Sequence, residues 1–423
     1  MLIFIKNTDI NAEIDLPLSK SESNRALMIL YYSKNLETWK PENLEISDSD
    51  DTVLLQHLLN IINEHSPLSP ALASKSEIIE LDCANAGTVL RFLMTAVGCD
   101  SRHTYLLTGC DRMKSRPVDS LVETLRNLGV SIEYKERESF PPLVVKGKTI
   151  VGGKMEVCAE RSSQYASSLL LASPLWEKGI ELTLAGNIAS LPYIDMTINM
   201  MRICGIEVER DCRTIVVKPG KYQIENIRIE PDWSAASFWY EMSALSDTSN
   251  LVLKNLRLDS LQADSVAAKY FDYLGVKSMQ SDNDLRLIKC SAVSENNLTF
   301  DFTSCPDLFP AVIATCAGLK KNAVFTGIKN LSIKESDRKN AMIEELKKIN
   351  ISFGLKSDDA IEMKCPETLP YFTEEKPIVF NNYCDHRIAM ALSVLSLKIG
   401  AIEMDNSEVV SKSYPEFFRA LNC

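Results

Sequence analysis

The stretch Leu125-Arg126-Asn127-Leu128-Gly129-Val130 holds the pattern that decides the fold: the end of an amphipathic helix, a small turn residue and the start of a β-branched strand. Glycine often ends a helix, because it adopts the left-handed backbone conformation without steric cost. The pattern returns in three more stretches, Met201-Arg202-Ile203-Cys204-Gly205-Ile206, Phe271-Asp272-Tyr273-Leu274-Gly275-Val276 and Leu346-Lys347-Lys348-Ile349-Asn350-Ile351. The four turn residues are 76, 70 and 75 positions apart, which indicates an internal repeat.

Weaker copies near residues 60–63 and 420–422 bring the expected number of units to six. A unit of about 70–75 residues suits an αβ supersecondary unit, although helix–glycine–strand also occurs by chance in α/β proteins. Single cores stop growing at roughly 250–300 residues, so a chain of 423 residues predicts two domains. We therefore expect three units per domain, with a hinge near Glu230-Pro231-Asp232.

The composition is that of a globular protein, with 45% hydrophobic and 24% charged residues. No run approaches the about 20 apolar residues of a membrane span, and residues 1–6 predict a short strand rather than a signal peptide. Twelve scattered cysteines without a C-x-x-C pair and four unclustered histidines predict no metal and a reducing cytoplasm. A net charge of −11 disfavours nucleic acid as a partner but allows a local pocket for small anions.

Five helices begin with a capping residue and a polar or basic side chain ahead of an apolar run. Free N–H groups and the positive end of the helix dipole make such starts anion sites, and lysine or arginine strengthens them. Ordinary helix capping explains any one of them, but basic residues there oppose the dipole, and a bound anion would offset that cost. The five starts are Ser19-Lys20-Ser21-Glu22-Ser23-Asn24-Arg25, Asn85-Ala86-Gly87-Thr88, Ser162-Ser163-Gln164-Tyr165, Lys334-Glu335-Ser336-Asp337-Arg338 and Asp385-His386-Arg387.

Together with a few shorter motifs, these segments resemble the EPSP synthase family over nearly the whole chain. The shorter motifs are Arg112-Met113-Lys114-Ser115-Arg116-Pro117, Pro192-Tyr193-Ile194-Asp195, Pro306-Asp307 and Ser411-Lys412-Ser413-Tyr414-Pro415. The sequence departs from the usual family pattern at Leu18, Ala84, Phe92, Ser332 and Lys339. Leu18 and Phe92 bear on the local shape near Lys20 and Gly87.

The resemblance implies an α/β fold of two domains, each made of three αβ units as an inside-out α/β barrel, with the active site in the cleft between them. It implies that residues 1–18 join 231–423 in one domain and that 19–230 form the other. The implied reaction moves the enolpyruvyl group of phosphoenolpyruvate to the 5-hydroxyl of shikimate 3-phosphate, in the pathway to chorismate and aromatic amino acids. We expect a cytoplasmic monomer that needs no cofactor, and a glyphosate target.

The same resemblance assigns roles to individual residues. Asp307 is the expected base at the sugar hydroxyl, Glu335 serves proton transfer at C3 of the donor, and Lys20 is the third catalytic residue. The residues expected to bind phosphoenolpyruvate are Lys20, Gly87, Arg116, Gln164, Arg338, Arg387 and Lys412. Those expected to bind shikimate 3-phosphate are Lys20, Ser21, Arg25, Ser162, Ser163, Gln164, Ser190, Tyr193, Asp307, Asn330 and Lys334.

Each assignment has a plainer alternative. Asp307 would be a helix cap after Pro306, Glu335 a first-turn residue favoured by the helix dipole, and each basic residue a solvated surface charge. For His386, structural and functional roles stay open.

Two other functions stay open at this point. UDP-N-acetylglucosamine enolpyruvyl transferases are similar in fold and donor and rely on a loop cysteine, and Cys110 lies six residues before Arg116. The flanking residues of that loop resemble EPSP synthases instead. A catalytically dead anion-binding protein would have lost Asp307, Glu335 or Lys20, and all three are present.

Overall fold

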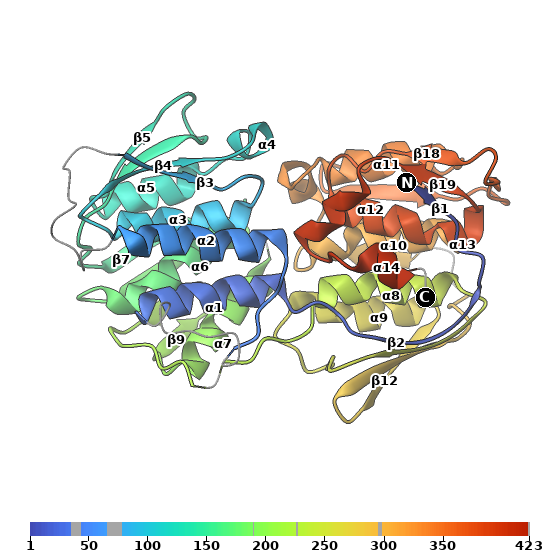
Figure 1. Ribbon diagram of the computed structural model, residues 1–423, viewed down its shortest axis with the longest axis horizontal. Coiled ribbons are helices and arrows are strands. Elements are labelled where there is room, and N and C mark those ends of the chain that lie inside the picture. Colours follow the sequence, from blue (N-terminus) through green and yellow to red (C-terminus); the bar gives the residue numbers. More distant parts are fainter. Residues whose placement is uncertain (35–43, 66–77, 189, 226, 295–297, 422–423) are drawn as a thin grey trace. The chain divides into compact units, whose positions relative to one another are not determined.

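The computed structural model describes residues 1–34, 44–65, 78–188, 190–225, 227–294 and 298–421 (Figure 1). The chain forms two compact units. Unit 1 contains Met1–Ser19 and Glu230–Cys423, and unit 2 contains Lys20–Ile229. The two ends of unit 1 are joined at an isolated antiparallel bridge between Leu18 and Pro231. There the Ser19 N–H donates to the Glu230 carbonyl at 2.8 Å.

Four sheets have the same construction: two parallel strands, followed by an antiparallel hairpin whose second strand pairs with the second of the parallel strands. Unit 2 holds β3 (Ile78–Asp82), β4 (Thr104–Thr108), β5 (Ser131–Tyr134) and β6 (Leu143–Lys146), and then β7 (Gly153–Cys158), β8 (Ile180–Ala185), β9 (Val208–Asp211) and β10 (Thr214–Val217). Unit 1 holds β2 (Asp9–Ile14), β11 (Thr248–Leu253), β12 (Val276–Ser281) and β13 (Asp284–Lys289), and then β14 (Leu298–Asp301), β15 (Ala323–Thr326), β16 (Ser352–Ser357) and β17 (Ala360–Lys364).

The four turn residues that define the repeat all have positive φ angles. Gly129, Gly205, Gly275 and Asn350 have φ of 87°, 80°, 86° and 66°. Each follows a helix and precedes the hairpin of its sheet, which confirms the repeat for these four copies. The four helices are α5 (Asp119–Asn127), α7 (Leu191–Ile203), α9 (Ala267–Tyr273) and α11 (Arg338–Lys347).

The weaker copies differ from this pattern. Helix α2 (Asp50–Glu64) ends one residue after Asn63, close to the expected position, and residues 66–77 that follow it lie outside the described residues. Asn422 lies outside the described residues. The remaining part of unit 1 is a three-stranded sheet of β1 (Leu2–Ile3), β19 (Ile402–Met404) and β18 (Ile378–Phe380), in the order β1-β19-β18. The remaining part of unit 2 contributes helices α1 and α2 and, among the residues described, no strand.

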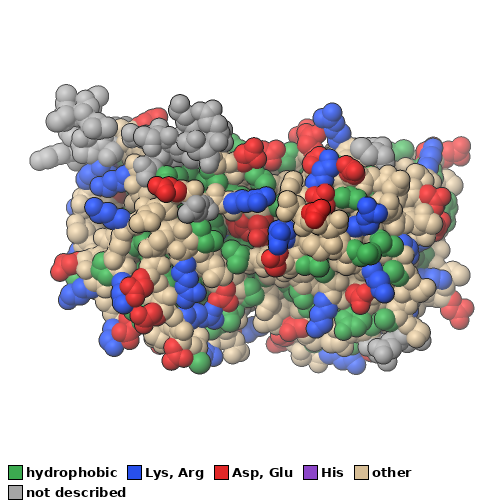
Figure 2. All heavy atoms as spheres, turned by 90° about the horizontal axis from the view of Figure 1, so that it is seen from below, with side chains coloured by type: hydrophobic (Ala, Val, Ile, Leu, Met, Phe, Trp, Pro, Cys, Tyr) green, Lys and Arg blue, Asp and Glu red, His purple; other side chains and the backbone are tan. Residues whose placement is uncertain are grey.

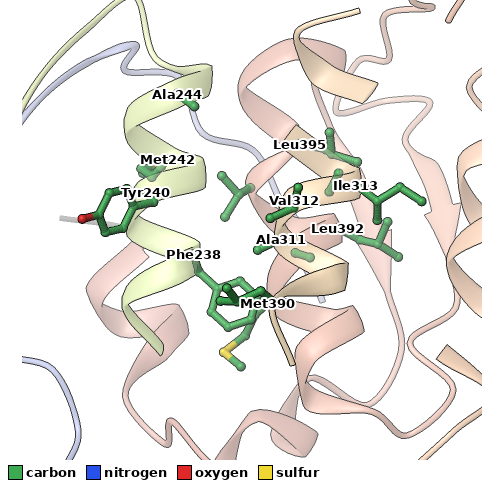
Figure 3. Packing of buried hydrophobic residues seen from close by; sticks show 14 of the residues in the cluster. Phe238, Tyr240, Met242, Ala244, Ala311, Val312, Ile313, Met390, Leu392 and Leu395 are labelled. Carbon is green, nitrogen blue, oxygen red and sulfur yellow. The ribbon is translucent and has the colours of Figure 1, made fainter. Parts of the chain in front are cut away.

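Each unit has three buried helices at its centre. Unit 2 has α1 (Lys20–Tyr32), α3 (Gly87–Gly98) and α6 (Gln164–Ala172), and unit 1 has α8 (Trp233–Leu245), α10 (Phe309–Gly318) and α12 (His386–Val394). Within each unit the three helices pack against one another. All residues of α10 and α12 are buried, as their apolar sequences on every side require. Figure 3 shows core side chains from all three helices of unit 1, among them Phe238 of α8, Val312 of α10 and Met390 of α12.

Shorter helices complete the units: α4 (Asp111–Lys114), α13 (Ser396–Ile399), α14 (Phe417–Leu421) and the 3₁₀ helices η3 (Pro306–Leu308), η4 (Lys329–Ile333) and η5 (Ser407–Lys412). In the part of the chain that the structure describes, no helix is long and apolar enough to cross a membrane. On the face shown in Figure 2, acidic and basic side chains are interspersed.

Candidate active site

In unit 2, the first turns of the buried helices α3 and α6 are joined by the side chain of Gln164. Its amide nitrogen donates to Thr88 Oγ1 at 2.7 Å, and its amide oxygen accepts from Arg91 Nη1 at 2.8 Å. Gln164 was expected from the sequence to bind substrate, whereas Arg91 was not. The signal for Arg91 was its place one turn after Gly87 in the same helix start, on the face that α6 covers.

Two guanidinium groups lie over the backbone at the start of α3. A Cβ atom built on Gly87 would lie 2.5 Å from Arg91 Nη1 and 2.6 Å from Arg116 Nη1. Both arginines are buried, with 5% and 6% of their surface exposed. Two cations beside the positive end of a helix dipole repel one another and the dipole, and an anion bound there would offset that repulsion. The structure therefore brings Gly87 and Arg116 together at a place suited to a carboxylate or phosphate.

At the start of α1, Lys20 pairs with a carboxylate that sequence reasoning missed. Its ammonium lies 3.1 Å from Asp51 Oδ2, and only 11% of the Lys20 side chain and 7% of the Asp51 side chain are exposed. Asp51 lies in the first turn of α2, where an acidic residue looks like an ordinary partner of the helix dipole. The sequence does not show whether Asp51 serves the helix dipole or pairs with Lys20, because the two residues are 31 positions apart.

Arg25 is buried between α1, α6 and α7. Its guanidinium donates to Thr197 Oγ1 at 2.7 Å, to the Tyr193 carbonyl at 3.1 Å and to the Ser21 carbonyl at 2.7 Å. Burial lowers the pKa of Arg25 to about 10. The structure thus brings Ser21, Arg25 and Tyr193 together and uses Arg25 to hold the start of α7. Phe92, one of the departures from the usual family pattern, lies under this guanidinium, with its ring centroid 5.8 Å from Arg25 Cζ.

The expected serines lie at or just before the starts of α6 and α7. Ser162 Oγ accepts from the Gln164 N–H at 3.2 Å, and Ser163 is the buried residue just before α6. Ser190 precedes α7 in the left-handed conformation, with φ of 55°. Unit 2 therefore presents hydroxyl groups and cations around the starts of its buried helices.

In unit 1, the guanidinium group of Arg338 donates hydrogen bonds to three carboxylates. Arg338 is completely buried and donates through Nη1 to Asp307 at 2.6 Å, through Nη2 to Glu335 at 2.7 Å and through Nε to Asp385 at 2.8 Å. Asp385 also caps α12, where its Oδ1 accepts from the Arg387 N–H at 3.0 Å. This network links the two residues with expected proton-transfer roles to the starts of α11 and α12.

Asp307 faces cations on two sides. Its Oδ2 accepts from Arg387 Nη2 at 3.0 Å, and Lys334 Nζ lies 3.9 Å from its Oδ1. Burial by itself would raise the pKa of Asp307, but Arg387, Lys334 and Arg338 together lower it below its usual range. Asp307 is therefore ionised at neutral pH and available to accept a proton.

The capping interpretations of the two carboxylates are wrong. Helix α10 begins at Phe309, and no side chain of the described part of the chain caps it; Asp307 lies in η3 and bonds arginines instead. Helix α11 begins at Arg338 with Asp337 as its cap, so Glu335 lies before the helix rather than in its first turn. The basic residues Arg116, Arg338, Arg387 and Lys412 are all buried, which excludes the reading of solvated surface charges for them.

The remaining expected residues lie near this network. His386 is buried, and its Nε2 contacts Arg387 Nη1. Lys412 ends η5, which packs against α12, and Asn330 lies in η4, just before Lys334. Sequence reasoning missed two residues that contact this cluster, Ser234 at the start of α8 and Asp264 in the short 3₁₀ helix Ala263–Val266. Their only signal was two ordinary polar residues near a helix start.

Comparison with known proteins identifies relatives along the whole chain. The family model described as EPSP synthase (3-phosphoshikimate 1-carboxyvinyltransferase) matches residues 5–421. Two proteins of Bacteroides fragilis named 3-phosphoshikimate 1-carboxyvinyltransferase are similar to it. The one from strain YCH46 is 36% identical, covering 98% of this chain and 95% of that protein. The one from strain ATCC 25285 is 37% identical, covering 97% of this chain and 94% of that protein.

Two solved structures share the fold. EPSP synthase from Acinetobacter baumannii has a TM-score of 0.73 at 21% identity, covering all of this chain and 97% of that chain. The enolpyruvyl transferase NikO from Streptomyces tendae has a TM-score of 0.70 at 13% identity, covering 99% and 96%. These likenesses confirm the expected fold class, a mixed α/β fold of the enolpyruvyl transferase type.

Proposed function

Since this chain belongs to the EPSP synthase family, we infer that it is an enzyme that transfers the enolpyruvyl group of phosphoenolpyruvate to the 5-hydroxyl of shikimate 3-phosphate. The products are inorganic phosphate and the enolpyruvyl ether of the acceptor. The observation that carries this inference is the Arg338 network, because it gathers two carboxylates suited to proton transfer and two buried arginines suited to anions.

The reaction requires acid–base chemistry at two atoms. The acceptor hydroxyl loses its proton as its oxygen attacks C2 of the donor, and C3 of the donor gains a proton. The tetrahedral intermediate then expels phosphate as C3 gives up a proton. We assign the first proton to Asp307 and the proton movements at C3 to Glu335, with Lys20 as the third catalytic group.

Electrostatics supports this division of roles. Without substrate, the cations Arg338, Arg387 and Lys334 are neutralised by carboxylates of the protein itself. When the carboxylate and phosphate of the donor take over Arg387, Asp307 loses one of the charges that hold its pKa down. Asp307 then becomes a stronger base when a donor is present to react, which couples base strength to binding.

The binding residues divide into two groups. For phosphoenolpyruvate we propose Lys20, Gly87, Arg116, Gln164, Arg338, Arg387 and Lys412. For shikimate 3-phosphate we propose Lys20, Ser21, Arg25, Ser162, Ser163, Gln164, Ser190, Tyr193, Asp307, Asn330 and Lys334. The burial of the four arginines among them supports these sets, because a guanidinium group shielded from water binds a carboxylate or phosphate more strongly than an exposed one.

A turnover assay tests the function. Purified protein is mixed with phosphoenolpyruvate and either shikimate 3-phosphate or UDP-N-acetylglucosamine, and phosphate release is followed. We expect phosphate release when the acceptor is shikimate 3-phosphate and none when it is UDP-N-acetylglucosamine. Release with the nucleotide sugar would favour the other enolpyruvyl transferase, and binding of shikimate 3-phosphate without release under any condition would indicate a catalytically dead relative.

A further inference from the structure

We propose that Asp264 is a positioning residue of this site, which holds the guanidinium of Arg387 in place through the hydroxyl of Ser234. The proposal rests on the proposed function in one respect, namely that Arg387 binds the anionic donor. Asp264 belongs to none of the motifs that pointed to the reaction, and it lies far from them in the sequence.

The contacts form a directed chain. Arg387 Nη2 donates to Ser234 Oγ at 3.1 Å, and the Ser234 hydroxyl donates to Asp264 Oδ2. Because serine has one hydroxyl proton, its donation to Asp264 leaves a lone pair of Ser234 facing Arg387. The same Nη2 also donates to Asp307 Oδ2 at 3.0 Å. Asp264 thus decides how the Ser234 hydroxyl is turned, and Ser234 decides where Arg387 points.

Asp264 has no other evident use for its charge. The residue is 2% exposed, and its Oδ1 has no hydrogen-bond partner among the described residues. A buried carboxylate with a bare oxygen is costly for folding. Its neighbour Gln262 already holds the start of α8, since Gln262 Oε1 accepts from the Trp233 N–H at 2.9 Å. Helix α8 therefore does not need Asp264 as its anchor.

The charges around Asp264 make its ionisation sensitive to the site. Asp232 and Ser234 face it from the start of α8, Asp307 from the segment before α10, and Arg387 from α12. Cys305 also lies close, and burial keeps the pKa of its thiol above the usual range. Burial first, and then the charge of Asp307, raise the pKa of Asp264 to about 7.

These charges set the direction in which the binding of phosphoenolpyruvate depends on pH. An anion bound at Arg387 adds negative charge near Asp264 and favours its protonated form, so binding takes up a proton from solvent. The affinity for phosphoenolpyruvate should therefore weaken as the pH rises through about 7. In Asp264→Asn, which keeps an oxygen facing Ser234, this part of the dependence should vanish. The titration of the donor itself is common to both proteins and cancels in the comparison.

The test is a double-mutant cycle with KM for phosphoenolpyruvate as the readout. Ser234→Ala should raise KM roughly tenfold, the cost of one hydrogen bond to a charged group. Ser234→Thr, which keeps the hydroxyl, should have a KM close to that of wild type. In an Arg387→Ala background, Ser234→Ala should add no further change, because its effect passes through the arginine. Asp259→Asn, an exposed aspartate of the same segment, is the matched control and should behave as wild type.

Three outcomes would overturn the proposal: an unchanged KM in Ser234→Ala, an equal effect of Ser234→Ala with and without Arg387, or an Asp264→Asn profile parallel to wild type. Failure of the proposed function looks different, because the wild-type protein would then release no phosphate from phosphoenolpyruvate and shikimate 3-phosphate, and an Arg387 that does not bind the donor would leave KM unchanged in Arg387→Ala. Circular dichroism confirms folding, and the Asn and Thr variants keep the test valid should an alanine variant fail to fold.

Discussion

Asp307 and Arg338 are joined by a hydrogen bond of 2.6 Å, although they belong to different helices and Arg338 is completely buried. The bond holds Asp307, the expected base, against the guanidinium of Arg338, which also donates to Glu335 and Asp385. This arrangement keeps Asp307 ionised and immobile before substrate arrives. Removal of the Asp307 carboxylate should therefore slow the chemical step without weakening the binding of the donor.

Asp307→Ala should therefore lower kcat by about 10²–10⁴-fold, the usual cost of losing a general base. KM for phosphoenolpyruvate should stay unchanged or fall, because Arg338 and Arg387 lose an internal anion that competes with the donor. Steady-state kinetics separates the two effects. Asp358→Ala, at an exposed hairpin, is the control. A kcat within a few-fold of wild type would remove Asp307 from the role of base.

Gly87→Ala should weaken the binding of phosphoenolpyruvate. The new methyl group would lie 2.5 Å from Arg91 Nη1 and 2.6 Å from Arg116 Nη1, so both guanidinium groups must move. They are ends of flexible side chains, and the fold should survive. We expect KM for phosphoenolpyruvate to rise roughly tenfold, since small misplacements at a site are costly. Inhibition by glyphosate, an anion of similar charge but greater length, should weaken further.

The same helix offers a matched control for that substitution. A Cβ at Gly98, at the other end of α3, would make only ordinary contacts, the nearest at 3.6 Å from Val130. Gly98→Ala should leave both KM and glyphosate inhibition unchanged. If the two alanine variants behave alike, the guanidinium pair over Gly87 does not hold the donor.

Cys110→Ser should keep full activity. Cys110 is exposed and precedes the short helix α4, where its side chain makes no capping bond, and serine is a good residue at such a position. Alkylation of this thiol should likewise leave phosphate release intact. The comparison is with Cys212→Ser, an exposed cysteine in the turn between β9 and β10. Complete loss of activity in a folded Cys110→Ser protein would assign the reaction to this cysteine.

Glu241→Met should stabilise the protein. Glu241 is fully buried in α8, both of its carboxylate oxygens lack hydrogen-bond partners among the described residues, and burial raises its pKa well above the usual value. A carboxyl with a raised pKa makes the folded state hold an extra proton, so stability falls as the pH rises from the unfolded pKa toward the folded one. An apolar side chain of similar shape removes a penalty of roughly 1–3 kcal/mol.

Urea unfolding at several pH values measures this effect. The gain of Glu241→Met over wild type should be largest at neutral or higher pH. It should shrink as the pH falls below the unfolded pKa of about 4.3, where the wild-type carboxyl is protonated in both states. Glu241→Gln, which is polar but uncharged, should lose the pH dependence and gain less. Destabilisation by both substitutions at neutral pH would show that the carboxylate makes a favourable interaction.

The sequence by itself determined the features that depend on neighbouring residues. Gly129, Gly205, Gly275 and Asn350 specify left-handed helix ends through their own backbone preferences, and the apolar runs of α10 and α12 require burial whatever surrounds them. The regular spacing of those ends predicted the repeat. Near Asn63 the helix end is shifted by one residue, to Glu64.

Only the tertiary structure decided which charges meet. Arg338 bonds Asp307 and Asp385, which are 31 and 47 positions away, and Lys20 pairs with Asp51. Ser234 lies 153 positions from Arg387 and 30 from Asp264. Side-chain preferences act over a few residues, whereas such partners are chosen by the packing of whole helices. For that reason the motifs indicated the expected base and the cations, but which carboxylate balances which cation became visible only in the folded protein.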